Sequence, residues 1–239
     1  MLDTTVVKNL IFDLDDTLFD TFGQLVAPAA AEACVAMIEA GMAASLDQAL
    51  EARHRILSLN RRVNVYRALL DHFGVKTGGY SPSQIENIGF LKFHDRPVIE
   101  NIFPFGDTIG TLLTLSEKYK LSLGTLGVPR TQKTKTEKLC IQDYFSEIFY
   151  VDIQVTTSKA AAFSKIMENT QTTATENLCI GNRIDSEIKE AKELGMQTIL
   201  MKHGEYLTMA PSIETEIPDS SIEKLSELLT LLRPQGLFL

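Results

Sequence analysis

Blocks of apolar residues alternate with polar stretches along the chain, and this pattern predicts short buried strands connected by helices. The first block, residues 6–12, is rich in Val, Leu and Ile and ends abruptly in carboxylates. Such a run is typical of a strand buried on both faces of a parallel sheet. After residue 103 we expect further strands at 120–126, 148–151, 177–181 and 197–201, each followed by a helical pattern. This alternation predicts an α/β core, a doubly wound, mostly parallel Rossmann-like sheet.

Residues 20–99 interrupt that alternation with helical patterns and no convincing strand. Ser45, with Gln48 three residues later, has the pattern of a capping box, and Gly74 is a natural helix stop. Ser81 followed by Pro82 opens another helix. We therefore expect an inserted, all-helical second domain over 20–99, and a core domain built from 1–19 and 100–239.

The last part of the chain predicts a loop followed by one helix. Residues 203–219 contain two prolines and read as loop-rich. Ile222, Leu225, Leu228 and Leu232 then recur at helical spacing. This spacing predicts an amphipathic helix over 220–232 that packs its apolar face on the sheet.

Composition and charge narrow the possible partners. The chain has 239 residues, 44% of them hydrophobic, which suffices for one large or two modest cores. A net charge of −8 without a basic run argues against nucleic acid and anionic membrane as main partners. An anionic substrate remains compatible, because a bound metal ion inverts the local field. Three separated cysteines, and no apparent leader or apolar stretch approaching a membrane span, predict a soluble, cytoplasmic protein.

The chemistry-bearing residues begin at the end of the first strand, in Asp13-x-Asp15-x-Thr17. In open α/β sheets, ligands bind outside the carboxyl ends of the strands. Buried carboxylates need a cation or hydrogen-bond donors, so this cluster favours a binding site. The alternative is a polar strand-to-loop turn with no function beyond its geometry.

Asp13-x-Asp15-x-Thr17-Leu18 after an apolar strand resembles the first motif of the haloacid dehalogenase-like (HAD) hydrolase superfamily. The resemblance implies that Asp13 is a nucleophile forming an aspartyl-phosphate, and that Asp15 is a general acid/base. It also implies Mg²⁺ held by these two acids, with Thr17 near the substrate. A carboxylate attacks a phosphoryl group only when a metal draws off charge, and a second carboxyl can protonate the leaving oxygen. The helical insertion is similar to the cap domain of many members.

A second strand end resembles the family's second motif. Thr125 stands where the family has a Thr or Ser, and the implied role is to hydrogen-bond the phosphoryl oxygens. Leu126 and Gly127 are the neighbouring candidates for substrate contact. Family members often have Asn where Leu126 stands, so one possible donor is missing here.

The third motif's lysine is matched by Lys159 at the start of a predicted helix. Its implied role is to neutralise the charge of the nucleophile and the phosphoryl group. Ala160 replaces the proline that commonly follows. Lys165, and Lys133 and Lys135 in the preceding helix, are alternatives for this role.

The fourth motif departs from the family pattern of Gly-Asp followed by a second acid. Asn182 replaces the first acid, Glu187 matches the second, and Asp185 is an additional acid. An amide oxygen can still ligate Mg²⁺, so the expected metal set is Asp13, Asp15, Asn182 and Asp185. Asp185 can equally serve as a helix N-cap.

The resemblance therefore implies a Mg²⁺-dependent phosphatase that acts on a small phosphorylated metabolite, as a monomer or homodimer. Asn182 and Leu126 motivate an alternative, a non-catalytic or regulatory HAD-like binding protein. A haloacid dehalogenase or phosphonate hydrolase is a further alternative. Asp15 disfavours it, because neither subclass normally has an acid at that position.

Overall fold

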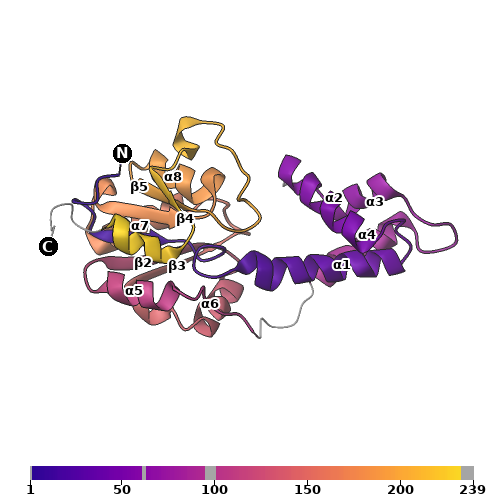
Figure 1. Ribbon diagram of the computed structural model, residues 1–239, viewed down its shortest axis with the longest axis horizontal. Coiled ribbons are helices and arrows are strands. Elements are labelled where there is room, and N and C mark those ends of the chain that lie inside the picture. Colours follow the sequence, from indigo (N-terminus) through magenta and orange to yellow (C-terminus); the bar gives the residue numbers. More distant parts are fainter. Residues whose placement is uncertain (1, 61–62, 95–100, 233–239) are drawn as a thin grey trace. The chain divides into compact units, whose positions relative to one another are not determined.

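The structure, a computed structural model, describes residues 2–60, 63–94 and 101–232 (Figure 1). The chain divides into two compact units, residues 1–21 with 99–239 (unit 1) and residues 22–98 (unit 2). Of the two domain boundaries expected from sequence, the one at 99–100 lies outside the described residues.

Unit 1 is built on a six-stranded sheet in the order β3-β2-β1-β4-β5-β6. Every neighbouring pair runs parallel, so the predicted α/β class with a parallel sheet is confirmed. The first strand lies in the interior of the sheet, and all four of its residues are buried, as expected for its apolar residues Leu10–Phe12. The polar side chain of Asn9 is bonded to Asn177 and Ser122. The strands are β1 (Asn9–Phe12), β2 (Lys120–Gly127), β3 (Glu147–Asp152), β4 (Asn177–Gly181), β5 (Gln197–Met201) and β6 (Ser220–Ile222).

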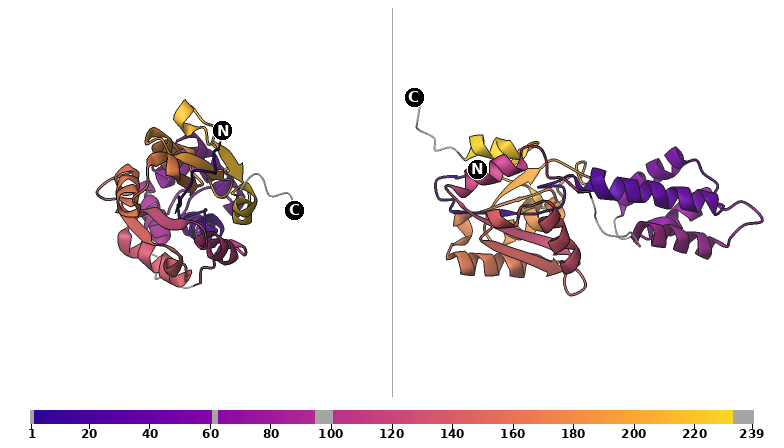
Figure 2. Two further views of the ribbon diagram at one scale, coloured as in Figure 1. Left: turned by 90° about the vertical axis from the view of Figure 1, so that its left-hand side faces the viewer. Right: turned by 90° about the horizontal axis from the view of Figure 1, so that it is seen from below.

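Helices cover both faces of this sheet (Figure 2). On one face, Phe163 and Ile166 from α7 and Ala191 from α8 pack with Ile11 and Cys179 of the strands. Because the helices connect parallel strands, the carboxyl ends of β1, β2 and β4 lie next to one another on the same side of the sheet. The helices are α5 (Thr108–Ser116), α6 (Pro129–Lys138), α7 (Ala160–Thr170), α8 (Lys189–Glu193) and α9 (Leu228–Leu231).

The predicted helix over residues 220–232 is wrong in its first half. Ser220–Ile222 forms β6, which pairs with β5 in the register Ile199↔Ser220. Only a 3₁₀ turn, Leu225–Glu227, and the short α9 are helical. The edge of β5 offers backbone hydrogen bonds to this segment. Ile222 is buried, and either a strand or a helix could bury it. Spacing of apolar residues alone does not separate the two.

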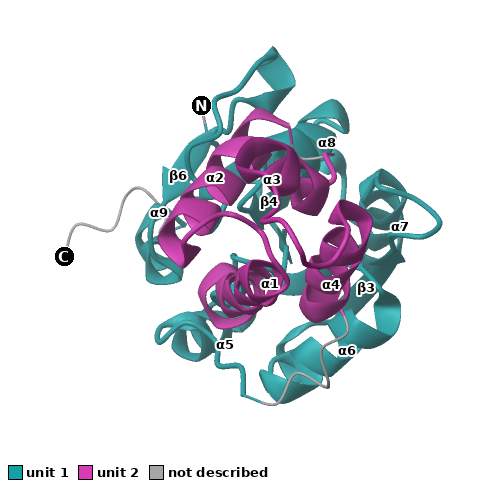
Figure 3. Ribbon diagram, turned by 90° about the vertical axis from the view of Figure 1, so that its right-hand side faces the viewer, with its two compact units in different colours: residues 1–21, 99–239 teal, residues 22–98 magenta. Residues whose placement is uncertain are grey.

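Unit 2 is helical (Figure 3). Ser45 and Gln48 form the predicted capping box at the start of α2, and Gly74 ends α3 with a φ of 77°. A core of its own includes Met37, Leu69 and Ile85, all fully buried. The elements are a π-helical turn, η1 (Phe22–Val26), followed by α1 (Ala27–Glu39), α2 (Leu46–Leu59), α3 (Val65–Phe73) and α4 (Pro82–His94).

One helical stretch in the described part of the chain, Phe22–Glu39, is long and apolar enough by composition to cross a membrane. The expectation that no apolar stretch approaches a membrane span is therefore wrong. The stretch contributes Ala33, Cys34 and Met37 to the core of unit 2, and 28% of it is buried.

Candidate active site

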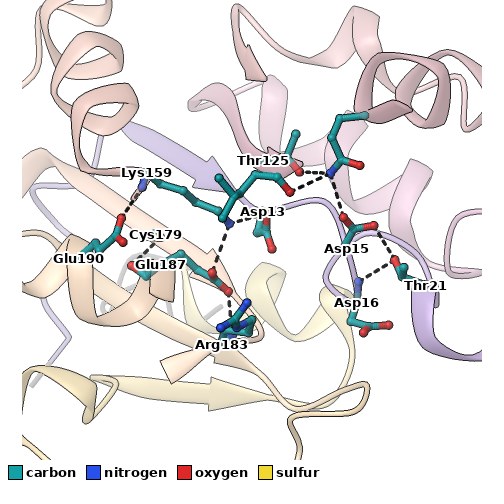
Figure 4. Close-up of polar contacts among 12 residues, drawn as sticks. Asp13, Asp15, Asp16, Thr21, Thr125, Lys159, Cys179, Arg183, Glu187 and Glu190 are labelled. Carbon is teal, nitrogen blue, oxygen red and sulfur yellow. Dashed lines mark hydrogen bonds and ion pairs between the residues drawn. The ribbon is translucent and has the colours of Figure 1, made fainter. Parts of the chain in front are cut away.

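Asp13 is the first residue after β1, and its backbone amide donates to the Ile180 carbonyl of β4 at 2.9 Å. Its carboxylate is buried, and Oδ1 accepts a hydrogen bond from Lys159 Nζ at 2.7 Å (Figure 4). Lys159 lies at the N-cap of α7 and is also buried. The structure thus brings together two predicted residues that are 146 positions apart in sequence.

A second carboxylate, that of Glu187, contacts the same ammonium group. Its Oε2 lies 3.2 Å from Lys159 Nζ, and its Oε1 accepts from the Arg183 amide at 2.7 Å. Burial raises the pKa of Asp13 to about 7; Lys159 opposes this shift, and Glu187 adds to it. The sequence placed Glu187 near a metal but did not reveal its contact with Lys159.

Asp15 has its own set of donors, separate from those of Asp13. Its Oδ1 accepts from Lys135 Nζ at 2.6 Å and from Thr21 Oγ1 at 2.8 Å, and its Oδ2 accepts from Gln132 Nε2 at 2.8 Å. Burial works to raise the pKa of Asp15. The Lys135 charge and these hydrogen bonds outweigh burial and lower that pKa below its usual range. In the protein without substrate these contacts therefore favour the carboxylate form of Asp15, which must take up a proton before it can act as an acid.

Thr125, Leu126 and Gly127 all lie against the side chain of Gln132. The Thr125 hydroxyl accepts from Gln132 Nε2 at 2.5 Å, and the Leu126 carbonyl lies 3.4 Å from the same nitrogen. A Cβ on Gly127 would lie 2.9 Å from Gln132 Cγ, so the glycine makes room for this side chain. Thr17 is fully buried, and its hydroxyl has no hydrogen-bond partner among the described residues.

Sequence reasoning missed Gln132 and left Lys135 as an alternative to Lys159. In the structure each lysine forms an ion pair with a different carboxylate: Lys159 with Asp13, and Lys135 with Asp15. Lys133 is exposed and lies 4.0 Å from Glu137. Lys165 is exposed and pairs with Glu168.

In the fourth motif the two metal candidates have different surroundings. Asn182 is buried, and its Nδ2 donates to the His203 carbonyl at 3.4 Å, which leaves the amide oxygen to accept. Both oxygens of Asp185 instead accept from the Arg183 guanidinium, each at 3.1 Å. That guanidinium also lies 4.6 Å from the centroid of the Tyr206 ring.

The charges around Asp13 leave a surplus that suits a cation. When Asp13 is ionised, the carboxylates of Asp13, Asp15 and Glu187 face the ammonium groups of Lys159 and Lys135, which leaves one negative charge. Asp13 follows β1 and Asn182 follows β4, and these neighbouring strands pair in register. Carboxylate and amide oxygens are ligands that Mg²⁺ accepts. The donor set therefore fits magnesium at Asp13 and Asn182. The carboxyl oxygens of Asp15 and Asp185, the other two predicted ligands, accept hydrogen bonds from protein donors.

A second group of possible metal ligands, unforeseen from sequence, lies in the same unit. Ligand atoms of Asp16, Asp20 and His203 lie within 4.8 Å of one another. His203 Nε2 is 2.9 Å from Asp20 Oδ1, and Asp16 has a φ of 53°. Only the fold brings His203 to these acids, because it lies 183 positions from Asp20.

Comparison with known proteins gives concordant matches. Residues 59–201 match the family described as haloacid dehalogenase-like hydrolase. Glyceraldehyde 3-phosphate phosphatases of Methanocaldococcus jannaschii and Methanopyrus kandleri are each 29% identical to the chain, over 95% of it and 98% of their own length. The Bacillus subtilis protein YfnB, solved bound to magnesium, has a TM-score of 0.63 and 21% identity, over 95% of this chain and 98% of that one.

Proposed function

The chain belongs to the haloacid dehalogenase-like hydrolase family, and from this premise we propose that it is a phosphatase acting on a small phosphomonoester. The observation that carries the proposal is the buried pair of Asp13 Oδ1 and Lys159 Nζ at 2.7 Å. This lysine leaves Asp13 Oδ2 without a hydrogen bond among the described residues, as a nucleophile requires. Asp15, two residues further along the loop, supplies the second carboxyl group.

The proposed reaction has two steps on these carboxyl groups. Asp15 first takes up a proton from solvent, which the negative charge of the bound ester favours. Asp13 Oδ2 then attacks phosphorus while the bond from phosphorus to the leaving oxygen breaks, and that proton passes from Asp15 to the leaving oxygen. Asp15, now a carboxylate, takes a proton from a water molecule as that water attacks phosphorus. The bond from phosphorus to Asp13 Oδ2 breaks, which releases phosphate and restores the Asp13 carboxylate. Lys159 holds positive charge beside the phosphoryl oxygens throughout, and the Thr125 hydroxyl lies at the end of the adjacent strand.

Asp13 and Asn182 would hold Mg²⁺, which when bound neutralises phosphoryl charge. Asn182 brings an amide in place of a carboxylate, so the site offers one negative charge fewer than the family pattern. We infer that metal affinity is correspondingly lower, because affinity for hard cations rises with the charge of the ligands.

The names of the two archaeal relatives support a three-carbon phosphorylated aldehyde as the first substrate to test. Phosphate release would be measured with glyceraldehyde 3-phosphate, dihydroxyacetone phosphate, glycerol 3-phosphate and phosphoglycolate, with Mg²⁺ and with a chelator. We expect turnover that needs Mg²⁺ and is fastest on a three-carbon ester.

Asp13→Asn is the critical variant of that experiment, and Asp3→Asn is its matched control at an exposed position. We expect loss of turnover in Asp13→Asn and wild-type rates in Asp3→Asn. Unchanged turnover in Asp13→Asn would contradict the assignment of the nucleophile. A wild type that hydrolyses no ester would overturn the phosphatase and favour a binding role.

A further inference from the structure

Helix α6 buries a polar face where a helix packed on a sheet ordinarily buries an apolar one. Its sequence, PRTQKTKTEK, has no large apolar residue. Gln132, Lys135 and Thr136 are nevertheless buried, and their i, i+3, i+4 spacing puts them on one face. Burying amide and ammonium groups is unfavourable unless each finds partners. The partners of this face therefore explain why the helix lies where it does.

Thr136 anchors the helix to the edge of the sheet. Its hydroxyl lies 2.7 Å from the Tyr150 hydroxyl of β3 and accepts from Gln142 Nε2 at 2.9 Å. Gln142 Nε2 also donates to Tyr150 at 3.1 Å. This closed network fixes the position of α6 and leaves Gln132 and Lys135 facing Asp15.

Gln132 and Lys135 between them bind both oxygens of Asp15. Gln132 Nε2 donates to Asp15 Oδ2 and to Thr125 Oγ1, and so ties the end of β1 to the end of β2. Lys135 Nζ donates to Asp15 Oδ1 and lies 5.8 Å from the centroid of the buried Phe19 ring. Gly127 makes the arrangement possible, because any larger residue there would collide with the Gln132 side chain.

We propose that Gln132 and Lys135 are positioning residues that aim the Asp15 carboxyl group at the leaving oxygen. The inference rests on the proposed function, because it concerns the proton that Asp15 gives to that oxygen. It adds that helix α6 sets the direction of the transfer, and that Gln132 fixes Asp15 relative to Thr125. The two residues act through Asp15 and do not themselves react.

The test compares two esters that differ in their need for this proton. An alkyl phosphate such as glycerol 3-phosphate releases a strongly basic alkoxide, whereas 2,4-dinitrophenyl phosphate releases a stable phenolate without protonation. The quantity is kcat/KM, which reports the steps up to phosphoryl transfer to Asp13 and excludes the later water step. Gln132→Met and Lys135→Met remove the donors at similar side-chain length. Lys133→Met, on the exposed side of the same helix, is the matched control.

We expect Gln132→Met and Lys135→Met to lose about 10²-fold in kcat/KM on the alkyl ester and only about threefold on the dinitrophenyl ester. Lys133→Met should match wild type on both. If Gln132→Met fails to fold, Gln132→Glu, which also removes the donor, replaces it. If Lys135→Met fails to fold, the Gln132 variants decide the test. Lys135→Arg, which keeps a donor, should recover part of the alkyl-ester rate.

Equal losses on the two esters would overturn the inference, since a purely structural role affects both alike. Wild-type rates in both variants would overturn it as well. In each case the phosphatase proposal stands, because wild type still turns over. A wild type that hydrolyses neither ester would instead contradict the proposed function, and the inference would fall with it.

Discussion

At the scale of single residues, two glycines determine which side chains reach the site. Gly127 ends β2 and makes room for Gln132, and Gly181 ends β4 and makes room for Glu187. In both cases a Cβ would lie under 3 Å from the neighbouring side chain. Each glycine therefore lets a side chain from the following helix fold back toward the strand end and contact a group of the site.

Gly181→Ala should displace Glu187 from Lys159. The added Cβ would lie 2.3 Å from Glu187 Cγ, so the carboxylate must move and its hydrogen bond to the Arg183 amide is lost. We expect about 1–3 kcal/mol of lost stability, typical of overpacking, and about tenfold lower kcat/KM, as Lys159 loses a partner. Gly110→Ala in α5, where a Cβ meets nothing within 4 Å, is the control and should be neutral or stabilising. Wild-type behaviour of Gly181→Ala would contradict this account of Glu187.

Asn182→Asp should tighten Mg²⁺ binding, because it restores a negative charge beside Asp13. We expect about tenfold stronger affinity by isothermal titration calorimetry, a gain of about 1.4 kcal/mol. Asp185→Asn should change the affinity little, since the Asp185 carboxylate is engaged by Arg183. The opposite ranking of the two variants would show that Asp185 is the group that senses the metal.

Residue patterns predicted one half of the site better than the other. Asp13 and Lys159 were predictable because they match motifs of the family, one at a strand end and the other at a helix start. Gln132 was not, because its role depends on which way α6 faces. One signal was present: a helix without large apolar residues must bury polar groups if it packs on a sheet.

At the scale of elements, the sheet edge at β5 and β6 is held by Asp219. Its Oδ2 accepts from the Thr198 amide at 2.8 Å, and its Oδ1 accepts from Lys192 Nζ at 2.6 Å. Although burial works to raise the pKa of Asp219, the hydrogen bonds from Lys192 and Thr198 lower it below 3.8. One side chain thus joins β5, α8 and the segment entering β6.

Asp219→Asn should therefore cost about 1 kcal/mol of unfolding free energy at neutral pH, the usual value of such hydrogen bonds. A lowered folded-state pKa contributes stability above the unfolded pKa, and that contribution is lost as pH falls through the folded pKa. The difference from wild type should thus shrink as the pH falls below about 4. Urea unfolding across this range measures it, with the exposed Asp143→Asn as baseline. If the difference in unfolding free energy between Asp219→Asn and wild type does not change with pH, the loss of stability comes from packing and not from the charge of Asp219.

Elements were predicted well wherever both faces are buried. The interior strands β1 and β4 each carry a run of three apolar residues, and β2 carries a leucine at every second or third position. The sequence places all three strands correctly. The edge strand β6 has only three residues, two of them serines, so its pairing with β5 is visible only in the folded chain. The spacing of apolar residues over 220–232 predicted which residues are buried, but it did not distinguish a strand from a helix.

At the scale of the whole molecule, family membership rests on residues 59–201, which exclude Asp13 and Asp15. The archaeal relatives extend the similarity over 95% of the chain. The interruption of the strand pattern by helices predicted an insertion, and unit 2 is helical with a core of its own. That this unit covers the site as a cap remains a prediction.

Mg²⁺ should stabilise the folded protein through unit 1. A ligand present at a hundred times its Kd stabilises the native state by about 2.7 kcal/mol. We expect a rise in melting temperature with Mg²⁺ that is abolished in Asp13→Ala and retained in Asp3→Asn. A rise of equal size in Asp13→Ala would place the cation elsewhere, and the group of Asp16, Asp20 and His203 would be the next position to test.

The most direct test of the central claim is to look for the phosphoryl group on Asp13. The protein would be mixed with Mg²⁺ and the best ester, quenched in acid within the first turnovers, and its peptides analysed by mass spectrometry. We predict that the peptide containing Asp13 gains the mass of one phosphoryl group, and that Asp13→Asn shows no such gain. Rapid phosphate release without phosphorylation of this peptide, or with the group on another residue, would contradict the account.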